Sequence, residues 1–434
     1  MTEPAAVSWA PTRALGRSVL LTGLLLLLGV ALGRVDLVLL AAPFAIGAAL
    51  NLRRRPEAVP EVTVTADEAH LVEGGAVRAG LTVANPEAIG YDLVVVRTKT
   101  SPWLRLQHAD RPFAITVPSD GWAAIDLPGE ALRWGRQDVG PAAARAAACG
   151  GLLACRPVVT PARGVRVYPV TEPFKATEAM PAAAGLVGAH RSRRLGEGGE
   201  LAGVRQFAPG DRLRRIDWRV SLRTRDLHVA ATLSDRDAEV LLLLDLLGEV
   251  GLSGGVGGSA SVLDTTVRAA AAIAEHYLHR GDRVSLLEYG AAARRLRAAS
   301  GRRQYLTVLE WLLDVRADPV DEEYEPALGA QHISSSALVV VLTPLIDPRA
   351  ADMLAQLTQS GRYTVAVDTL PPDAAPPVRN QWSPLATRLW RIERENVLGR
   401  LREHGVPVVA WAGAGSLDLV LRDVARMAAA PRGR

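Results

Sequence analysis

The sequence predicts a chain of three parts: an N-terminal transmembrane α-hairpin, an all-β sandwich and a C-terminal α/β domain with a doubly wound parallel sheet. Three patterns support this prediction. Two uncharged apolar runs lie within residues 1–55, short alternating runs fill residues 60–170, and apolar strands alternate with amphipathic helices over residues 238–434. A chain of 434 residues is long enough to bury a core in each soluble part.

The composition narrows the class of protein further. Although 49% of the residues are hydrophobic, only 5% are aromatic, so the cores must be built mainly from Leu, Val and Ala. The net charge of +4 comes from arginine, because Lys99 and Lys175 are the only lysines. The two cysteines, Cys149 and Cys155, are too few for a disulfide-rich secreted scaffold, and their spacing fits no common zinc site.

The membrane hairpin is predicted from residues 18–33 and 37–52, which carry no charge and are separated by three residues. Each run of 16 residues would span about 24 Å as a helix. This is short of the ~30 Å hydrocarbon core, and snorkelling arginines and local thinning make up the difference. A cleaved signal peptide is the alternative interpretation, because basic residues precede the first run, but a second apolar run follows at once.

The residues that flank the two runs predict their orientation. Arg13 and Arg17 precede the first run and residues 53–55 are all arginine, whereas the turn holds only Arg34. By the positive-inside rule, both termini and the soluble domains face the cytoplasm from the inner (plasma) membrane, which the chain crosses twice.

Residues 60–170 alternate apolar and polar side chains in short runs separated by clusters of Gly, Pro, Asn and Asp. A period of two with regular turn signals predicts an antiparallel β-sandwich. No catalytic constellation occurs in this stretch, and we interpret it as a spacer or docking module. A linker rich in Ala and Gly is predicted to follow over residues 171–190.

The α/β domain is predicted from strands and helices that alternate along the chain after residue 238. Nearly continuous apolar runs predict buried strands at residues 238–246, 284–289, 337–343, 363–368 and 406–411. Helices are expected at 262–280, 302–315, 348–359 and 385–404, with a last one near 417–427. This order is typical of a parallel, doubly wound sheet.

An arginine-rich signature segment over residues 191–237 connects the two soluble domains. Ten arginines fall between Arg191 and Arg225, interrupted by acidic residues and accompanied by Phe207 and Trp218. The mixture of charges, aromatics and a Pro-Gly-Asp turn predicts a folded, hydrogen-bonded element. Within this element we expect Trp218 to be buried and part of a strand.

The signature also has a recognisable order of residue types. The residues that carry it are Arg205, Gly210, Asp211, Arg214, Asp217, Trp218, Ser221 and Arg223. Asp211 is predicted to cap backbone N–H groups or to accept Arg214 in a forked pair, whereas Arg212 and Arg215 are expected to be solvated.

This order resembles the signature of a bacterial family catalogued as domain of unknown function 58, and the resemblance covers most of the chain. It implies a von Willebrand factor A-like C-terminal domain. Genes of the family commonly lie beside one for a MoxR-type AAA+ ATPase. The resemblance therefore implies a membrane-anchored scaffold or adaptor in the assembly or maturation of protein complexes. The expected partners are that ATPase, other membrane proteins of the same gene neighbourhood and the lipid bilayer.

A metal site at the carboxyl edge of the sheet is not expected. Domains of the von Willebrand factor A type hold Mg²⁺ with D-x-S-x-S after the first strand and an Asp after a later strand. Asp245 fills the first position, but Leu247 and Glu249 replace the two serines, and Asp347 is displaced in sequence from the later position. Asp245 is expected either to form a degenerate site or to end its strand and cap the next segment.

Other motifs do not argue for an enzyme, and no cofactor is expected. Residues 251–255 match G-x-S-x-G, but Ser253 lies in a Gly/Ser loop well after the strand, so a membrane-anchored hydrolase is only the second alternative. His276 and His279 share a face near a helix end and are interpreted as structural surface residues. The first alternative is nucleic-acid or anionic-lipid binding by the signature arginines, with Trp218 and Phe207 stacking on bases. The interleaved acids argue against nucleic acid.

Overall fold

The computed structural model describes residues 9–66, 71–170, 195–208, 216–233, 239–291, 293–317, 333–334, 337–372, 374 and 382–411. It describes the backbone alone at 195–203 and 230–233. The predicted linker at 171–190 and the predicted helix near 417–427 lie outside these residues. The chain divides into two compact units, and the boundary lies between Tyr168 and Pro169.

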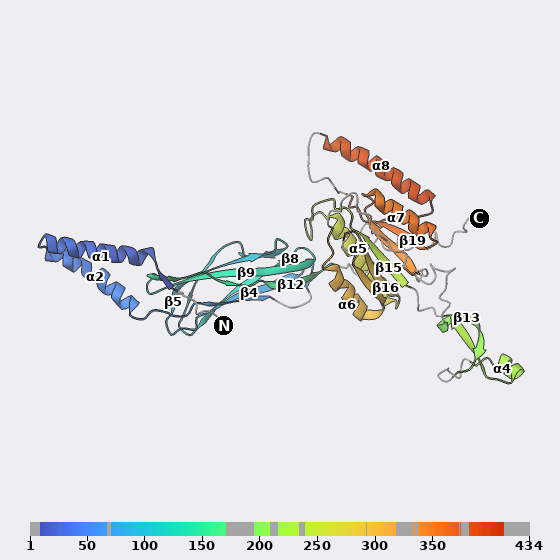
Figure 1. Ribbon diagram of the computed structural model, residues 1–434, viewed down its shortest axis with the longest axis horizontal. Helices are drawn as coiled ribbons and strands as arrows, with labels where there is room; N and C mark the ends of the chain where they lie inside the picture. The colour runs from blue at the N-terminus through green and yellow to red at the C-terminus, as the bar shows by residue number, and fades with distance from the viewer. Residues whose placement is uncertain are drawn as a thin grey trace. The chain divides into compact units, whose positions relative to one another are not determined.

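Two apolar helices form a hairpin near the N-terminus, α1 at Arg13–Ala31 and α2 at Val35–Leu52. Figure 1 shows them side by side. Gly29 allows their close approach, since a Cβ there would lie 2.9 Å from a methyl carbon of Val38. Both helices are long and apolar enough to cross a membrane. The 19 residues of α1 give a length of about 28 Å, because the helix begins earlier than the uncharged run.

The hairpin leaves and re-enters the same compact unit. The short strand β1 (Trp9–Pro11) precedes α1 and pairs antiparallel with β10 (Leu153–Cys155), a pairing that the sequence did not predict. The Trp9 indole N–H donates to the Ala58 carbonyl at 3.0 Å. The Thr12 hydroxyl donates to the Gly151 carbonyl at 2.8 Å. Both ends of the hairpin are therefore fixed to one folded unit.

The remainder of the first unit is built from strands in two sheets. They are β2 (Glu61–Ala66), β3 (Leu71–Val72), β4 (Ala76–Ala84), β5 (Tyr91–Thr100), β6 (Leu104–Leu106), β7 (Phe113–Val117), β8 (Trp122–Ala131), β9 (Gly135–Ala148), β11 (Val158–Thr160) and β12 (Arg163–Tyr168). The eight-stranded sheet follows the order β1-β10-β9-β12-β3, with β11 and β5 also on β9 and with β7 on β5. The four-stranded sheet has the order β2-β4-β8-β6.

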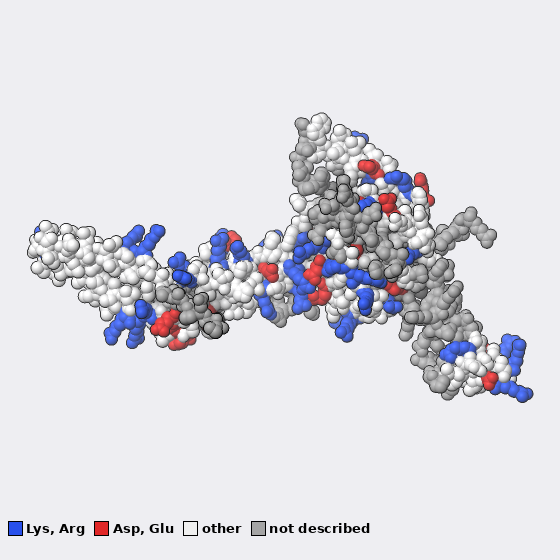
Figure 2. Space-filling model, in the orientation of Figure 1, with Lys and Arg blue, Asp and Glu red and all other residues white. Residues whose placement is uncertain are grey.

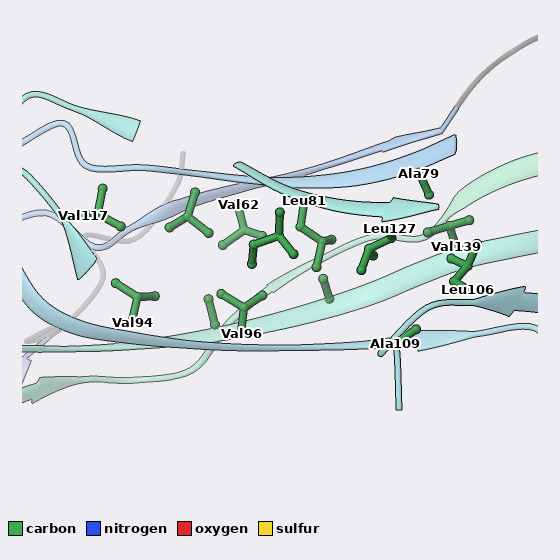
Figure 3. Close-up of a cluster of buried hydrophobic side chains, with 14 of the residues drawn as sticks. Val62, Ala79, Leu81, Val94, Val96, Leu106, Ala109, Val117, Leu127 and Val139 are labelled. Atoms are coloured by element: carbon green, nitrogen blue, oxygen red, sulfur yellow. The ribbon is translucent and has the colours of Figure 1, made fainter. Parts of the chain in front are cut away.

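Both sheets contribute to one hydrophobic core. Val62, Leu81 and Leu127 come from the four-stranded sheet, and Val94 and Val96 come from the eight-stranded sheet. Figure 3 shows these side chains pointing toward one another between the strands. The alternation in the sequence therefore reflects strands with one buried face, as the period of two predicts.

The second unit contains a six-stranded sheet with the order β17-β16-β15-β18-β19-β20 (Figure 1). The strands are β15 (Glu239–Asp245), β16 (Arg283–Tyr289), β17 (Arg295–Ala299), β18 (Ala337–Thr343), β19 (Tyr363–Asp368) and β20 (Val408–Ala410). The helices are α5 (Val262–His279), α6 (Gly301–Leu312), α7 (Pro348–Gln359) and α8 (Ser383–Glu403). The sheet is parallel except at β17, which pairs antiparallel with β16.

The antiparallel edge corrects the prediction of a fully parallel sheet. The run at Arg295–Ala299 has alternate exposed and half-buried residues, as an edge strand does, and it lacks the apolar run of a buried parallel strand. The central strand β15 is buried along nearly its whole length. Leu241 and Leu243 of β15 share one core with Met353 and Leu354 of α7.

Candidate functional site

The signature segment forms a two-stranded ribbon, and a short helix lies in the connection between its two strands. Strand β13 (Leu195–Gln206) pairs antiparallel with β14 (His228–Leu233), and α4 (Trp218–Thr224) lies between them in sequence. The Phe207 N–H donates to the Leu227 carbonyl at 2.8 Å, and Ile216 forms an isolated bridge to Val229. Buried Ile216 and Val229 anchor the entry to α4 on the ribbon.

Asp217 and Ser221 fix α4 in place. The Asp217 carboxylate accepts the N–H groups of Arg219 and Val220, both at 3.1 Å, and so caps the N-terminus of the helix. The buried Ser221 hydroxyl donates to the Asp217 carbonyl at 2.7 Å and accepts the His228 N–H at 2.9 Å. One hydroxyl thus joins the helix to β14.

Trp218 was predicted to be buried in a strand, and this prediction was wrong. It is the first residue of α4, and its side chain is 62% exposed. The chain turns into a helix at this point because Asp217 supplies the cap, a signal that is present in the sequence. Leu222 lies one helical turn further and is 79% exposed. We define the α4 face as Trp218 and Leu222 with the exposed arginines Arg219 and Arg223.

The other signature residues fall into two groups. Arg205 is exposed, and its guanidinium donates to the Gln206 carbonyl at 3.0 Å. Figure 2 shows Arg side chains gathered around the uncharged surface at α4. Gly210, Asp211 and Arg214 lie outside the described residues, so the predicted pair between Asp211 and Arg214 stays a prediction, as does the solvation of Arg212 and Arg215. Leu222 is a member of the face that the sequence analysis missed, because the segment was interpreted as a strand.

The second candidate lies at the carboxyl edge of the parallel sheet, where Asp245 ends β15. Its carboxylate accepts the Leu247 N–H at 3.1 Å and the Thr343 hydroxyl at 2.6 Å, and the hydroxyl in turn accepts the Leu345 N–H at 3.0 Å. Burial raises the pKa of Asp245 to about 6, against the opposing effect of the hydrogen bonds from Thr343 and Leu247. This agrees with the interpretation that Asp245 caps the segment after its strand.

Arginines occupy the rest of this edge. Asp347 caps α7 and forms an ion pair with Arg349 at 2.6 Å, and the hydrogen bond from this guanidinium lowers the pKa of Asp347. Asp368, at the end of β19, forms an ion pair with Arg394 at 2.5 Å. We define the Asp245 edge as these three carboxylates with their partners. Two of its acids are neutralised by guanidinium groups, and the third is closed off by a hydroxyl and an amide.

Leu247 and Glu249, which stand where a metal-binding D-x-S-x-S motif would have its two serines, have structural roles. Leu247 is part of the hydrophobic core, and the Glu249 carboxylate accepts the Leu263 N–H at 3.1 Å near the start of α5. Within the described ranges, no group of three or more His, Cys, Asp or Glu residues is arranged to hold a metal ion. The structure therefore gives Leu247 and Glu249 packing and capping roles.

The remaining sequence candidates have local roles. Ser253 lies in a loop in which the Gly254 N–H donates to the Ser259 carbonyl at 2.7 Å, and its hydroxyl accepts the Gly255 N–H at 3.3 Å. His276 is half-buried, and burial lowers its pKa to about 4, so it is neutral at pH 7. Cys149 and Cys155 are free and buried, and burial raises the pKa of both thiols.

These features together define a protein with an apolar helical hairpin, a two-sheet β unit and an α/β unit that carries a signature ribbon. Residues 203–375 match the model of a family described as Protein of unknown function DUF58, and this match supports assignment of the chain to that family. Uncharacterized proteins of Mycobacterium bovis and Mycobacterium tuberculosis are 34% identical to it over 137 residues, which is 31% of this chain. The chain spans 42% of the length of these relatives.

Comparison with solved structures gives only remote likenesses. The cupredoxin domain of amoB from Nitrosocaldus yellowstonii is 12% identical, with a TM-score of 0.18, and the match covers 29% of this chain and 98% of that one. The sporulation control protein Spo0M from Bacillus subtilis is 11% identical, with a TM-score of 0.16, and the match covers 31% of this chain and 54% of that one. At these scores neither likeness supports an inference about this protein.

Proposed function

We propose that the chain is a membrane-anchored cytoplasmic scaffold or adaptor whose α4 face binds a protein partner, a MoxR-type AAA+ ATPase, during assembly or maturation of protein complexes. The observation that carries this proposal is the exposure of Trp218 and Leu222 on a helix that is fixed by buried hydrogen bonds. In this proposal the β unit is a sandwich that serves as a spacer, and the α/β unit is a von Willebrand factor A-like domain.

The composition of the α4 face supports a protein partner. Tryptophan and arginine are the residue types most often found where binding energy concentrates in protein interfaces. Trp218 and Leu222 lie one turn apart on the same side of the helix, and the exposed Arg219 and Arg223 add positive charge along one flank of this pair. Because the helix is already ordered, a partner gains this contact without the entropic cost of folding a segment.

The anchoring part of the proposal rests on the hairpin. The residues before α1 and after α2 belong to one β-sheet unit, so a hairpin that spans the bilayer must have both ends on the same side. The flanking Arg13, Arg17 and residues 53–55 favour the cytoplasmic side for both ends. A signal peptide cleaved after α1 would also remove β1 from its pairing with β10.

The adaptor proposal is tested by affinity purification of the full chain from native membranes. Trp218→Ala and Leu222→Ala together are expected to reduce recovery of the ATPase about tenfold or more. Leu252→Ala is the matched control, because Leu252 is an equally exposed apolar residue outside the α4 face. Unchanged recovery with the double variant would contradict the proposal.

Nucleic-acid binding is the second candidate function, and the exposure of Trp218 favours it more than a buried Trp218 would. An exposed indole between arginines is able to stack on a base while the guanidinium groups contact phosphates. In that case the purified chain should bind single-stranded RNA with an affinity that falls steeply with salt. The same double variant would then lose RNA binding and keep any ATPase that is recovered.

A further inference from the structure

Helix α8 has two faces, and its inner face packs on the α/β unit. Leu401 is buried, and Val397 and Leu398 pack against the core cluster that contains α7. Arg394 reaches from the same face to Asp368, and its Nε–H donates to the Pro344 carbonyl at 3.0 Å. These contacts fix the orientation of α8 about its own axis.

The outer face of α8 carries a seam of large apolar side chains. The residues are Trp382, which is the N-cap of α8, and Leu385, Leu389 and Ile392 within the helix; they follow one another at intervals of three, four and three residues, and each is between 49% and 64% exposed. We call these four residues the α8 seam. This spacing places apolar side chains at alternate a and d positions of a heptad, the pattern with which one helix packs along another. The inner-face residues occupy the b, c and f positions, so α8 packs on the α/β unit through one face while the seam at a and d is left exposed on the other.

The charged residues beside the seam are complementary to a second copy of the same helix. With Leu385 and Ile392 at d positions, Arg388 and Glu395 fall at g, and Glu393 and Arg400 fall at e. All four are exposed. In a parallel pair, each g residue lies next to the e residue of the following heptad on the other helix. Arg388 then meets Glu393, and Glu395 meets Arg400, so each contact joins opposite charges.

Asn396 continues the seam at the next a position. A single Asn at an a position specifies the register of two paired helices, because its amide is satisfied when it faces the amide of the other copy. The apolar part of the seam therefore has a defined end, and the register that aligns Asn396 with its copy also aligns the charged pairs.

We propose that two copies of this chain associate through the α8 seam, with the two α8 helices parallel and in register. The second copy is the occupant because the seam, the flanking charges and Asn396 are complementary to themselves. This association is independent of the α4 face, which belongs to another part of the chain, and it holds whichever partner binds there.

The proposal is tested by cysteine cross-linking of the full chain in native membranes, with the unmodified chain as background for the two buried cysteines. In a parallel, in-register pair, equivalent a and d residues face each other. Leu385→Cys, Leu389→Cys and Ile392→Cys should therefore each form a disulfide-linked dimer on mild oxidation. Arg391→Cys is the control, because Arg391 is exposed but lies outside the seam. Cross-linking at one seam position alone would overturn the parallel arrangement, and no seam-specific cross-linking would overturn self-association.

A charge exchange tests the flanking pairs without altering the seam. Arg388→Glu places two acids together at both symmetric contacts and should weaken self-association about tenfold in detergent-solubilised full chain. Arg388→Glu combined with Glu393→Arg restores opposite charges and should restore the original dissociation constant. Equal weakening by the single and the double variant would overturn the pairing of Arg388 with Glu393.

Discussion

The α4 face and the Asp245 edge differ in whether their functional side chains are exposed or already have partners within the protein. At the Asp245 edge, the carboxylates that end two strands and the one that caps α7 are buried or paired: Asp245 with Thr343, Asp368 with Arg394 and Asp347 with Arg349. At the α4 face, the hydrogen-bonding groups of Asp217 and Ser221 are turned inward and apolar groups are turned outward.

This contrast shows that position in a fold does not decide which side chains remain available for binding. The carboxyl edge of a parallel sheet is where α/β proteins most often bind ligands, yet here its polar groups mainly bind one another. A short helix such as α4 is not a usual ligand-binding position in a fold, but its Trp218 is exposed and accessible to a partner. The following predictions test this difference, in order of decreasing effect.

The largest effect is expected at Asp245, from the comparison of two substitutions. Asp245→Asn removes a buried charge and keeps an acceptor for the Leu247 N–H, while its amide N–H is able to donate to the Thr343 hydroxyl, so it should be close in stability to the original chain at pH 7. Asp245→Ala leaves the Thr343 hydroxyl and the Leu247 N–H buried without this acceptor and should be about 3 kcal/mol less stable than the Asn variant. Hydrogen exchange of β15 and β18 measures the difference. Equal loss in both variants would mean that the negative charge itself is needed.

The pH dependence of stability should also report on Asp245. Its pKa is raised from 3.8 to about 6 in the folded protein, so the folded state holds a proton that the unfolded state has lost in this range. Its contribution to stability is present below the unfolded pKa and is lost as the pH rises through about 6, by roughly 3 kcal/mol in all. Hydrogen exchange at pH 4.5 and pH 7 (conditions about 2.5 units apart) should show this slope, and Asp245→Asn should flatten it. The same slope in the Asn variant would assign it to other groups.

A smaller effect is expected at Ser221. Ser221→Ala removes the hydroxyl that joins α4 to β14 and leaves the His228 N–H without this acceptor, at a cost of about 1–2 kcal/mol. The exchange of the amides in α4 and β14 should accelerate accordingly. Thr224→Ala serves as the control, because the exposed Thr224 hydroxyl contacts the Val220 and Asp226 carbonyls and the His228 ring but accepts no backbone N–H of β14. Equal acceleration in both variants would show that Ser221 does not fix the helix.

Much of the fold could be predicted from the sequence, because fully apolar runs fix strands with little ambiguity. The predicted strands at 337–343 and 363–368 have the bounds that the structure gives to β18 and β19. The strands that were missed are short or lie at an edge. β1 has three residues and ends in proline, and β17 carries arginines on its exposed side. Their pairing depends on distant partners that no local pattern reveals.

The candidate sites were predictable only in part, for a related reason. The absence of serines after Asp245 is visible in the sequence, but the partner that closes the site, Thr343, is 98 residues away. For Trp218 the local signal was present, since Asp217 is a good helix cap, but an apolar neighbour such as Ile216 favours a strand just as well. Burial was inferred from residue type, and tertiary structure placed this tryptophan on the surface instead.

The smallest expected effect is that of metal ions on the Asp245 edge. A ligand that binds only the folded state raises its stability in proportion to the logarithm of its concentration. Asp347 and Asp368 already have guanidinium partners, and the Asp245 carboxylate already accepts two hydrogen bonds, so a divalent cation would have to displace these groups. The melting temperature of the detergent-solubilised chain should therefore be the same with a chelator and with millimolar Mg²⁺. The Asn variant of Asp245 provides the control. If Mg²⁺ raised the melting temperature of the original chain but not that of the variant, the Asp245 edge would be a metal site. Its carboxylates would then be available for binding, as the α4 face is, and the contrast between the two regions would be contradicted.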